Sequence, residues 1–224
     1  MGGDSVAFQA NLLPSDDLPI RVLEAPSALI DPIIFDHHYS HTVPPNRWMC
    51  FAVYHHSLLK GAMQIGYGIR PEMKQHIIDG ANSETVKEFD RMWLSDDMPK
   101  NSESRVIGYM LRYLRKHYPE LKALISYADG LRGKVGTIYQ ATNFQYIGAV
   151  PGEFYHIPST DTWVHPVTMW HRHGTRARER LEALYPDIQH IRGDQHRYVY
   201  FLDDEWQNRL LQPILPYPKH AGVV

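Results

Sequence analysis

The chain is poor in several features that mark large classes of protein. Cys50 is the single cysteine among 224 residues, so an internal disulfide and a cysteine-rich zinc site are excluded, and a reducing compartment fits. No apolar run approaches the roughly 18 residues that a membrane-spanning helix requires. Residues 1–19 lack the basic start and apolar stretch of a secretory signal, and we expect them to form a flexible tail. We therefore expect a soluble cytoplasmic protein that does not bind membranes.

Neither sign of charge dominates the chain. Lys and Arg number 23 and Asp and Glu number 25, which gives a formal net charge of -2. This balance excludes a protein coated in positive charge but allows a local basic groove. Hydrophobic residues make up 43% of the chain and aromatic residues 12%. That content can build a substantial core, which excludes a disordered or fibrous protein.

The order of the predicted elements is typical of an α/β protein. The predicted strands are Ile20–Glu24, Trp48–His56, Leu58–Ile69, Thr85–Ser95, Leu121–Tyr127, Tyr146–Val150 and Arg197–Leu202. The predicted helices are Ala28–Tyr39, Ser102–Tyr118, Gly133–Asn143 and Thr175–Tyr185. Strands that alternate with helices in the centre of the chain indicate an α/β core. We expect this core over residues 20–155, with residues 156–224, which contain several prolines, forming an extension that packs on or completes it.

A polar segment before the central predicted helix has the composition of an anion site. Lys100–Arg105 contains two cations and three small polar residues, at a position where the helix N–H groups have no intrahelical partner. Such a helix start suits a phosphate or pyrophosphate. Alternatively, Asn101 or Ser102 simply caps the helix. Arg91, which lies between two aromatic residues on one face of the preceding strand, adds a cation that needs an anion or solvent.

The segment DHHYSH, residues 36–41, carries three histidines. His37 and His41 are four residues apart and share a face if the helix continues through them. Two histidines with a carboxylate from a distant segment form a known kind of iron site. The alternative is the end of a surface helix with solvated imidazoles.

The segment SYADGLRGKVGTIYQATNF, residues 126–144, follows a predicted buried strand. It places Ser126 and Asp129 at the carboxyl edge of a sheet, where α/β proteins usually bind ligands. Tyr139 lies in the following predicted helix, where a phenol can donate a proton or ligate a ferric ion. The alternative is a tyrosine packed in the core.

Basic residues gather in two segments. Arg105, Arg112, Arg115 and Lys116 recur at helical spacing. A second group surrounds a single acid, Glu179, and consists of His171, Arg172, His173, Arg176, Arg178 and Arg180. Clusters of this kind suit a polyanion such as DNA, and a solvated helix face is the ordinary alternative.

The stretch MWLSDDMPKNSESRVIGYMLRYLRKHYPELKALISYADGLRGKVGTIYQATNFQYIG, together with DHHYSH, resembles the Mom family of phage DNA-modification proteins. The resemblance spans roughly residues 20–150. It implies an α/β (α+β) fold similar to the GCN5-related N-acetyltransferases: a mixed, mostly antiparallel central sheet with splayed central strands and helices on both faces. It also implies an enzyme that uses acetyl-CoA and iron to convert the N6 amine of adenine in DNA to a methylcarbamoyl form. This product protects phage DNA from restriction in the host cytoplasm.

The resemblance assigns roles to particular residues. The catalytic candidates are His38, Tyr39, Ser126, Asp129 and Tyr139. The candidates that hold the cofactor pyrophosphate are Arg91, Ser102, Ser104 and Arg105. The candidate iron ligands are His38, Asp129 and Tyr139. One departure stands out, because acetyltransferases place a glycine-rich loop where this chain has no glycine and has Glu103.

Three functions follow from these patterns. The first is an acyltransferase-like enzyme that modifies adenine N6 in double-stranded DNA, with the target base flipped out of the stack. The second is a conventional N-acetyltransferase that acts on a protein or small-molecule amine. The third is a non-catalytic DNA-binding accessory protein, which the missing glycine loop favours. The sequence leaves a homodimer open.

Overall fold

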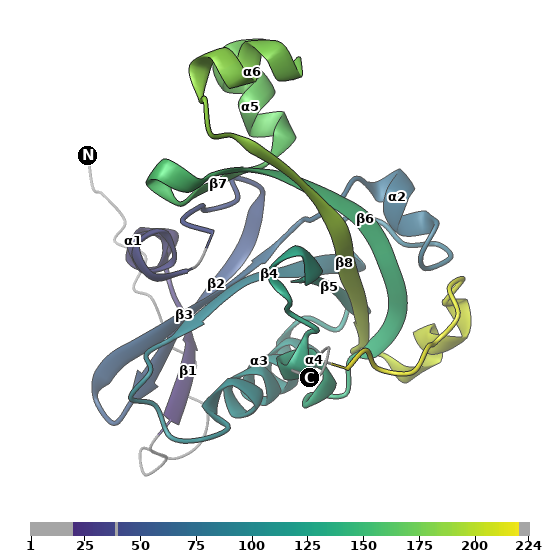
Figure 1. The fold of residues 1–224 in the computed structure, drawn as a ribbon. Helices are drawn as coiled ribbons and strands as arrows, with labels where there is room; N and C mark the ends of the chain where they lie inside the picture. The colour runs from purple at the N-terminus through teal and green to yellow at the C-terminus, as the bar shows by residue number, and fades with distance from the viewer. Residues whose placement is uncertain (1–19, 39, 220–224) are drawn as a thin grey trace, which may run out of the picture. The chain divides into compact units, whose positions relative to one another are not determined.

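The structure is a computed structural model that describes residues 20–38 and 40–219. The chain divides into two compact units (Figure 1). The first contains the residues up to Leu124 together with Phe201–Leu211, and the second contains Ile125–Tyr200 together with the residues from Gln212. The boundaries expected at residues 19 and 155 stay predictions.

The first unit is built on four consecutive antiparallel strands. They are β1 (Ile20–Glu24), β2 (Arg47–His55), β3 (Leu58–Gly66) and β4 (Val86–Leu94), which lie in that order. Its helices are α1 (Ser27–His37), α2 (Pro71–Gln75) and α3 (Ser102–His117). The predicted hairpin of β2 and β3 is confirmed, because the two strands pair antiparallel. The prediction came from the aromatic and β-branched residues of these segments.

Helices cover both faces of the first unit's sheet. On one face, Ile30 and Ile34 of α1 pack in a core cluster with Cys50 of β2. On the other, Phe51 makes an edge-to-face contact with Tyr113 of α3, with ring centroids 5.5 Å apart. Successive residues of a strand point to opposite faces of the sheet. Cys50 therefore contacts α1 on one face, and Phe51 contacts α3 on the other. Burial raises the pKa of the Cys50 thiol to about 11.

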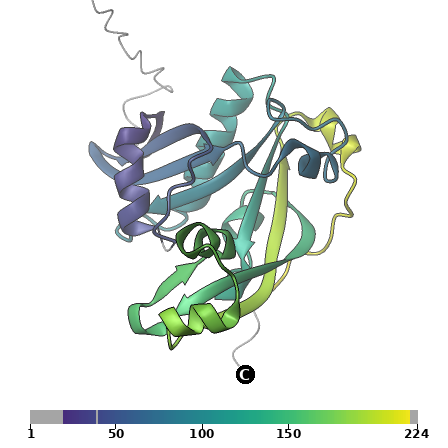
Figure 2. The same cartoon turned by 90° about the horizontal axis from the view of Figure 1, so that it is seen from above.

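The second unit contains strands in the order β5, β8, β6, β7. The strands are β5 (Ala123–Asp129), β6 (Gln145–Ile157), β7 (Thr162–Val164) and β8 (Gln189–Phe201). The helices are α4 (Thr137–Gln140), α5 (Pro166–His173) and α6 (Arg178–Leu184). Strands β6 and β8 pair antiparallel from Gln145 opposite Val199 to His156 opposite Gln189, and form a long ribbon that continues into β7 and the two last helices (Figures 1 and 2).

Several predicted bounds in the second unit were wrong. The helix expected over Gly133–Asn143 is the single turn α4, because Gly133 and Gly136 adopt the left-handed conformation (φ 69° and 74°) and delay its start. The strands expected over Tyr146–Val150 and Arg197–Leu202 are each 13 residues long. Strand β7 and helix α5 were not predicted.

The predicted fold class is confirmed: α/β, with mostly antiparallel strand pairing and helices on both faces of the first unit's sheet. The splaying of the central strands stays a prediction. Within the residues that the structure describes, every helix is too short or too polar to cross a lipid bilayer.

Candidate functional site

His38 is held in one orientation by the segment that follows it. The residue is buried and lies directly after α1, which ends at His37 rather than at the predicted Tyr39. Its Nδ1 accepts the backbone N–H of Ser40 at 3.2 Å and lies 2.8 Å from the Ser40 hydroxyl. Since a backbone N–H can only donate, Nδ1 is an acceptor and the ring proton of neutral His38 lies on Nε2.

The Ser40 hydroxyl is one link in a directed series of hydrogen bonds. It accepts from Thr42 Oγ1 at 3.1 Å. Thr42 Oγ1 accepts in turn from Nη2 of Arg91 at 3.3 Å, and Nε of Arg91 donates to the Thr42 carbonyl at 3.2 Å. Arg91 therefore fixes the segment that carries His38. Its predicted role at a pyrophosphate stays a prediction, and Tyr39 lies outside the described residues.

The shared face predicted for His37 and His41 does not form. The helix ends at His37, and His41 adopts a positive φ of 46° outside it. Nδ1 of His41 lies 2.9 Å from the carbonyl of Phe35, while His37 stacks on Trp93 of β4 with ring centroids 4.3 Å apart. These two histidines have separate structural roles and do not form a pair of ligands on one helix face.

The start of α3 is not capped by a side chain. Asn101 occupies the N-cap position in a left-handed conformation (φ 65°) and makes no side-chain capping bond. The hydroxyls of Ser102 and Ser104 donate to the carbonyls of Pro99 and Asn101, at 2.6 and 3.0 Å. The first N–H groups of this helix are thus not satisfied by a capping side chain.

Charged side chains flank this helix start. Arg105 is exposed in the first turn, and so is Glu103. An uncapped first turn of a 16-residue helix with an adjacent arginine is the kind of arrangement that can bind an anion. Ser102 is buried and its hydroxyl is engaged with the Pro99 carbonyl. The cofactor role of Ser102, Ser104 and Arg105 stays a prediction.

Asp129 is a buried carboxylate at the end of β5. Its Oδ1 is buried and has no hydrogen-bond partner among the described residues, while Oδ2 lies 3.7 Å from Nε of Arg132. Burial raises the pKa of Asp129 above its ordinary value, although the Arg132 guanidinium and the backbone N–H groups of Leu131 and Arg132 oppose this rise. A buried carboxyl group with a raised pKa is a better proton acceptor than an ordinary solvated carboxylate.

Tyr139 and Ser126 lie in more enclosed surroundings. Ser126 is fully buried within β5. The Tyr139 ring packs on Phe144 and Tyr198, with centroids 5.4 and 5.3 Å away, and remains partly exposed. The aromatic contacts give Tyr139 the packing role that was the alternative interpretation, and its chemical role stays a prediction.

The predicted residues fall into two groups. His38, Arg91, Ser102, Ser104 and Arg105 belong to the first unit, where Ser40 and Thr42 connect His38 to Arg91. Ser126, Asp129 and Tyr139 belong to the second unit. Over residues 20–38 and 40–219, no group of three or more His, Cys, Asp or Glu side chains is arranged to hold a metal ion. The predicted iron ligands His38, Asp129 and Tyr139 include a tyrosine and belong to different units, so the iron site stays a prediction.

Sequence reasoning missed a second set of buried polar groups, on β3 and β4. Gln64 is fully buried, its Nε2 lies 3.4 Å from Oδ2 of Asp90, and its Oε1 has no partner among the described residues. Burial raises the pKa of Asp90 to about 6 and that of Glu88 to about 7. The one sign of these buried polar groups in the sequence is a single glutamine, Gln64, inside the apolar run of β3.

The chain is similar in sequence and in structure to several known proteins. The Mom protein family matches residues 19–219. The methylcarbamoylase Mom of Escherichia phage Mu is 32% identical over 218 residues, which cover 96% of this chain and 90% of that protein. Among solved structures, an N-acetyltransferase from Staphylococcus aureus Mu50 is similar with 12% identity and a TM-score of 0.43, over 82% of this chain and 97% of that one. A GNAT-family acetyltransferase from Streptococcus pneumoniae is similar with 10% identity and a TM-score of 0.44, over 81% and 98%. The chain therefore belongs to the Mom protein family.

Proposed function

We propose that this protein is an acyltransferase-like enzyme that converts the N6 amine of adenine in double-stranded DNA to a methylcarbamoyl derivative. The observation that carries the proposal is the 32% identity to the methylcarbamoylase of phage Mu over 96% of this chain. In this proposal the modified base protects phage DNA from restriction in the host cytoplasm. Such a reaction needs groups that accept and donate protons, and buried His38 of the first unit and buried Asp129 of the second are the candidates for these roles.

Acetyl-CoA supplies carbon for the methylcarbamoyl group in the proposed reaction. A separate nitrogen donor supplies the additional nitrogen of this group, because transfer of the acetyl group alone would give N6-acetyladenine. The uncapped start of α3 binds the pyrophosphate of acetyl-CoA through backbone N–H groups, with Ser104 and Arg105 beside them. Exposed Glu103 points its charge to solvent. This arrangement replaces the glycine-rich loop of acetyltransferases with side chains.

Two groups handle protons in the proposed reaction. The exocyclic amine of adenine is a weak nucleophile, so its attack needs a proton acceptor. Asp129 fits this role because its carboxyl group is buried and has a raised pKa. His38 carries its ring proton on Nε2 and therefore serves as a hydrogen-bond donor to a developing negative charge. Tyr139 is the proposed proton donor to the leaving group.

Iron enters the proposal through the family resemblance. Because the described residues do not form a group of metal ligands, we derive no step through iron. Elemental analysis of the purified protein, before and after chelation, measures whether iron is bound. The rate of adenine modification, measured on the same two samples, shows whether loss of iron changes it.

The test is direct detection of the product. Plasmid DNA is incubated with the protein and acetyl-CoA under varied nitrogen sources, with and without iron, then digested to nucleosides and analysed by mass spectrometry. A methylcarbamoyl adduct on deoxyadenosine supports the proposal. Acetylation of peptides or small amines without any DNA adduct instead identifies a conventional acetyltransferase. DNA binding without consumption of acetyl-CoA identifies an accessory protein.

A further inference from the structure

A group of basic residues runs from the end of α5 through the turn that follows it into the start of α6. Residues 171–180 contain four arginines and two histidines but one acid, Glu179, in a protein whose formal net charge is -2. The two helices follow one another between β7 and β8, at the end of the β6–β8 ribbon (Figures 1 and 2). Positive charge is therefore concentrated on one structural element.

Three of these arginines are available to an external partner. Arg172, Arg176 and Arg180 are exposed, and none makes a salt bridge or side-chain hydrogen bond within the part of the chain that the structure describes. Arg178 is different, since its Nε lies 2.6 Å from Oε1 of Glu182. Nearby acids are engaged as well: Glu153 pairs with His190 at 2.8 Å.

The two helices are anchored rather than loosely attached. Met169 of α5 and Leu181 of α6 are buried in one cluster with Tyr155 of β6. Between the helices, Thr175 Oγ1 accepts the backbone N–H of Ala177 at 3.0 Å. The hydroxyl of Tyr185 also lies 3.0 Å from Nε2 of His173, which connects the ends of the two helices.

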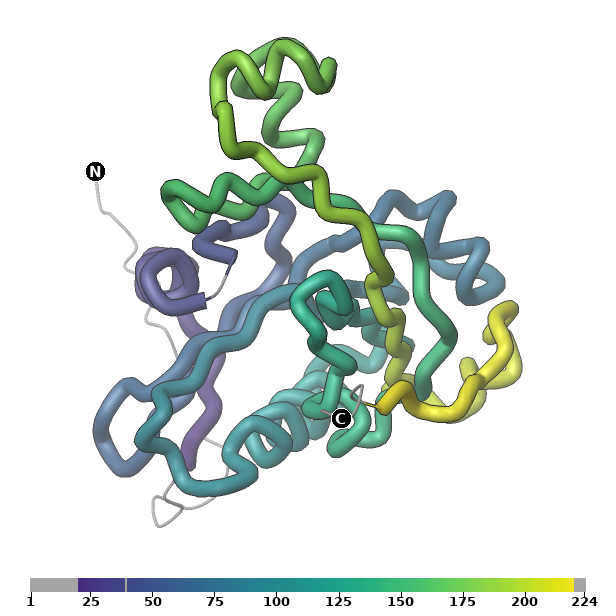
Figure 3. The backbone as a smooth tube through the Cα atoms, in the orientation of Figure 1, coloured from purple at the N-terminus to yellow at the C-terminus, as the bar shows by residue number. Residues whose placement is uncertain are grey.

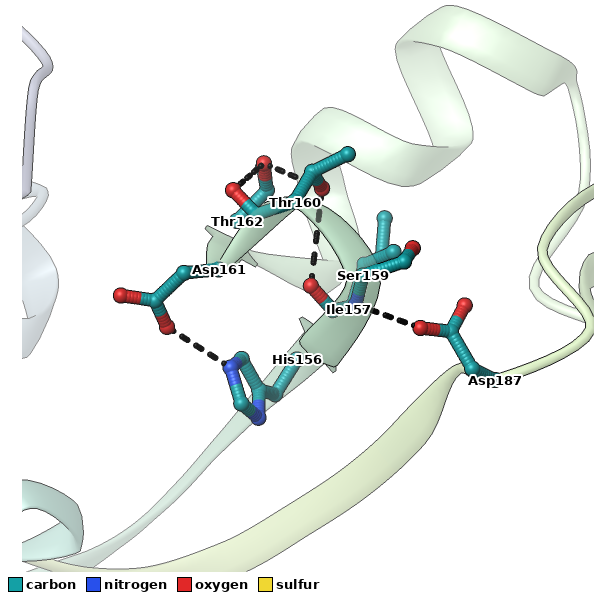
Figure 4. A network of polar contacts seen from close by, with 7 residues as sticks. All are labelled: His156, Ile157, Ser159, Thr160, Asp161, Thr162 and Asp187. Atoms are coloured by element: carbon teal, nitrogen blue, oxygen red, sulfur yellow. Dashed lines mark hydrogen bonds and ion pairs between the residues drawn. The ribbon is translucent and has the colours of Figure 1, made fainter.

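A polar network fixes the base of this element (Figure 4). The backbone N–H of Ser159, just after β6, donates to Oδ2 of Asp187 at 2.6 Å, which ties the β6–β7 turn to the segment after α6. Within the turn, His156 lies 3.0 Å from Oδ1 of Asp161. Charges held on an ordered support lose less conformational entropy when they bind a partner.

Trp170 distinguishes this surface from an ordinary solvated helix. Its side chain is 51% exposed on α5, two residues from Arg172. Exposed tryptophan and arginine side chains on the same structural element are typical of binding surfaces, where both residue types are enriched.

The other basic cluster is less available. On α3, Arg115 donates from Nε to the carbonyl of Leu202 at 2.8 Å and from Nη2 to that of Phe201 at 3.3 Å. The guanidinium of Arg112 lies over the Tyr109 ring, 4.7 Å from its centroid. These cations serve contacts within the first unit.

We propose that α5 and α6 form the docking surface for the sugar-phosphate backbone of double-stranded DNA. Arg172, Arg176 and Arg180 neutralise phosphates, and Trp170 contributes an apolar contact. The inference rests on the proposed function, which makes DNA the substrate, and it names the element that engages the duplex.

The test is the salt dependence of binding to a fluorescent DNA duplex. Each phosphate contact contributes about 0.9 to the slope of log K against log salt, so the triple variant R172A/R176A/R180A is expected to lower the slope by about 3. Its affinity at low salt is expected to fall about tenfold or more. W170A is expected to weaken binding without changing the slope. The control R112A/K116A, on α3, is expected to bind like the wild type.

The other possible results contradict either the docking surface or the proposed function. Unchanged affinity and slope in a triple variant that melts like the wild type overturns the proposal, as does wild-type binding to anionic lipid vesicles but not to the duplex. The nucleoside assay separates the two proposals. A wild type that binds DNA through these arginines but never modifies adenine refutes the proposed function alone. A triple variant that modifies duplex DNA at the wild-type rate refutes the docking surface alone.

Discussion

Nδ1 of the His38 imidazole accepts a hydrogen bond from the Ser40 hydroxyl at 2.8 Å. The same hydroxyl accepts from Thr42, which accepts from Arg91. A cation on β4 is thus connected to the histidine by two hydroxyl groups, each of which both accepts and donates. The ring is held in one tautomer and one orientation by residues that do not need to touch a substrate.

Removing the first hydroxyl of this series tests its purpose. Ser40→Ala is expected to lower the rate of adenine modification about tenfold to a hundredfold, because a misplaced catalytic group costs that much. Stability should fall by only about 1 kcal/mol. Initial rates and thermal melts measure both effects. Ser40→Thr keeps the hydroxyl and should retain most of the rate, and a wild-type rate in Ser40→Ala would contradict the positioning role.

The Asp129 carboxyl group should favour catalysis and lower the stability of the protein at high pH. Asp129→Asn is expected to lower the rate about 10²- to 10⁴-fold. Because the folded-state pKa is raised, this carboxyl group makes the wild type less stable as pH rises through that value, and the amide removes this loss. Rates and denaturant unfolding at pH 5 and pH 8 check both parts. A variant that keeps its rate excludes Asp129 as the proton acceptor.

Glu88 should give the stability of the protein a measurable pH dependence. Its pKa is raised by burial from 4.5 to about 7. The folded state therefore binds the proton more tightly than the unfolded state, and this contribution to stability is lost as pH rises from about 4.5 to 7. Glu88→Gln should remove roughly 2 to 3 kcal/mol of this loss. The free energy of unfolding of variant and wild type is measured by denaturant unfolding at several pH values in this range. If both change equally with pH, burial does not raise the pKa of Glu88.

The helix start of α3 makes a prediction about cofactor affinity. Arg105→Ala is expected to weaken acetyl-CoA binding about tenfold, since a charge-assisted hydrogen bond is worth about 1.5 to 3 kcal/mol. Calorimetric titration with acetyl-CoA measures the change. Arg112→Ala, on the same helix but two turns later, serves as the matched control and should bind normally. Equal affinities in both variants would place the pyrophosphate elsewhere.

Two glycines before α4 separate backbone strain from steric contact. Gly133 and Gly136 both have positive φ, but a Cβ at Gly133 meets nothing within 4 Å, whereas one at Gly136 meets Cε2 of Tyr198 at 2.5 Å. Gly133→Ala should therefore cost about 1 to 2 kcal/mol. Gly136→Ala should cost about 1 to 3 kcal/mol more. Urea unfolding measures the pair, and equal losses would contradict the packing of Tyr198.

The sequence predicted best where one periodic signal covered a whole element. Strand β2 and helix α3 were placed within one residue at each end, because aromatic density and helical spacing mark them throughout. Proline residues were a weaker signal in the last third of the chain. Pro166 does not interrupt regular structure but occupies the first turn of α5 after a His165 N-cap, where proline is favoured.

The contacts within the candidate site could not be predicted from local sequence patterns. Arg91 and Thr42 are 49 residues apart in sequence, so their hydrogen bonds depend on how β4 meets the segment after α1. Gln64 and Asp90 meet across two strands in the same way. Chemically active residue types could be named from the motifs, whereas the groups that orient them depend on tertiary structure.

The burial of Cys50 has a practical consequence. Its thiol is protonated at neutral pH and enclosed by core side chains, so maleimide dyes should not label the native wild type. A cysteine introduced at exposed Thr168 of α5 would then be the one reactive thiol. A fluorophore there would report directly on whether duplex DNA approaches that helix.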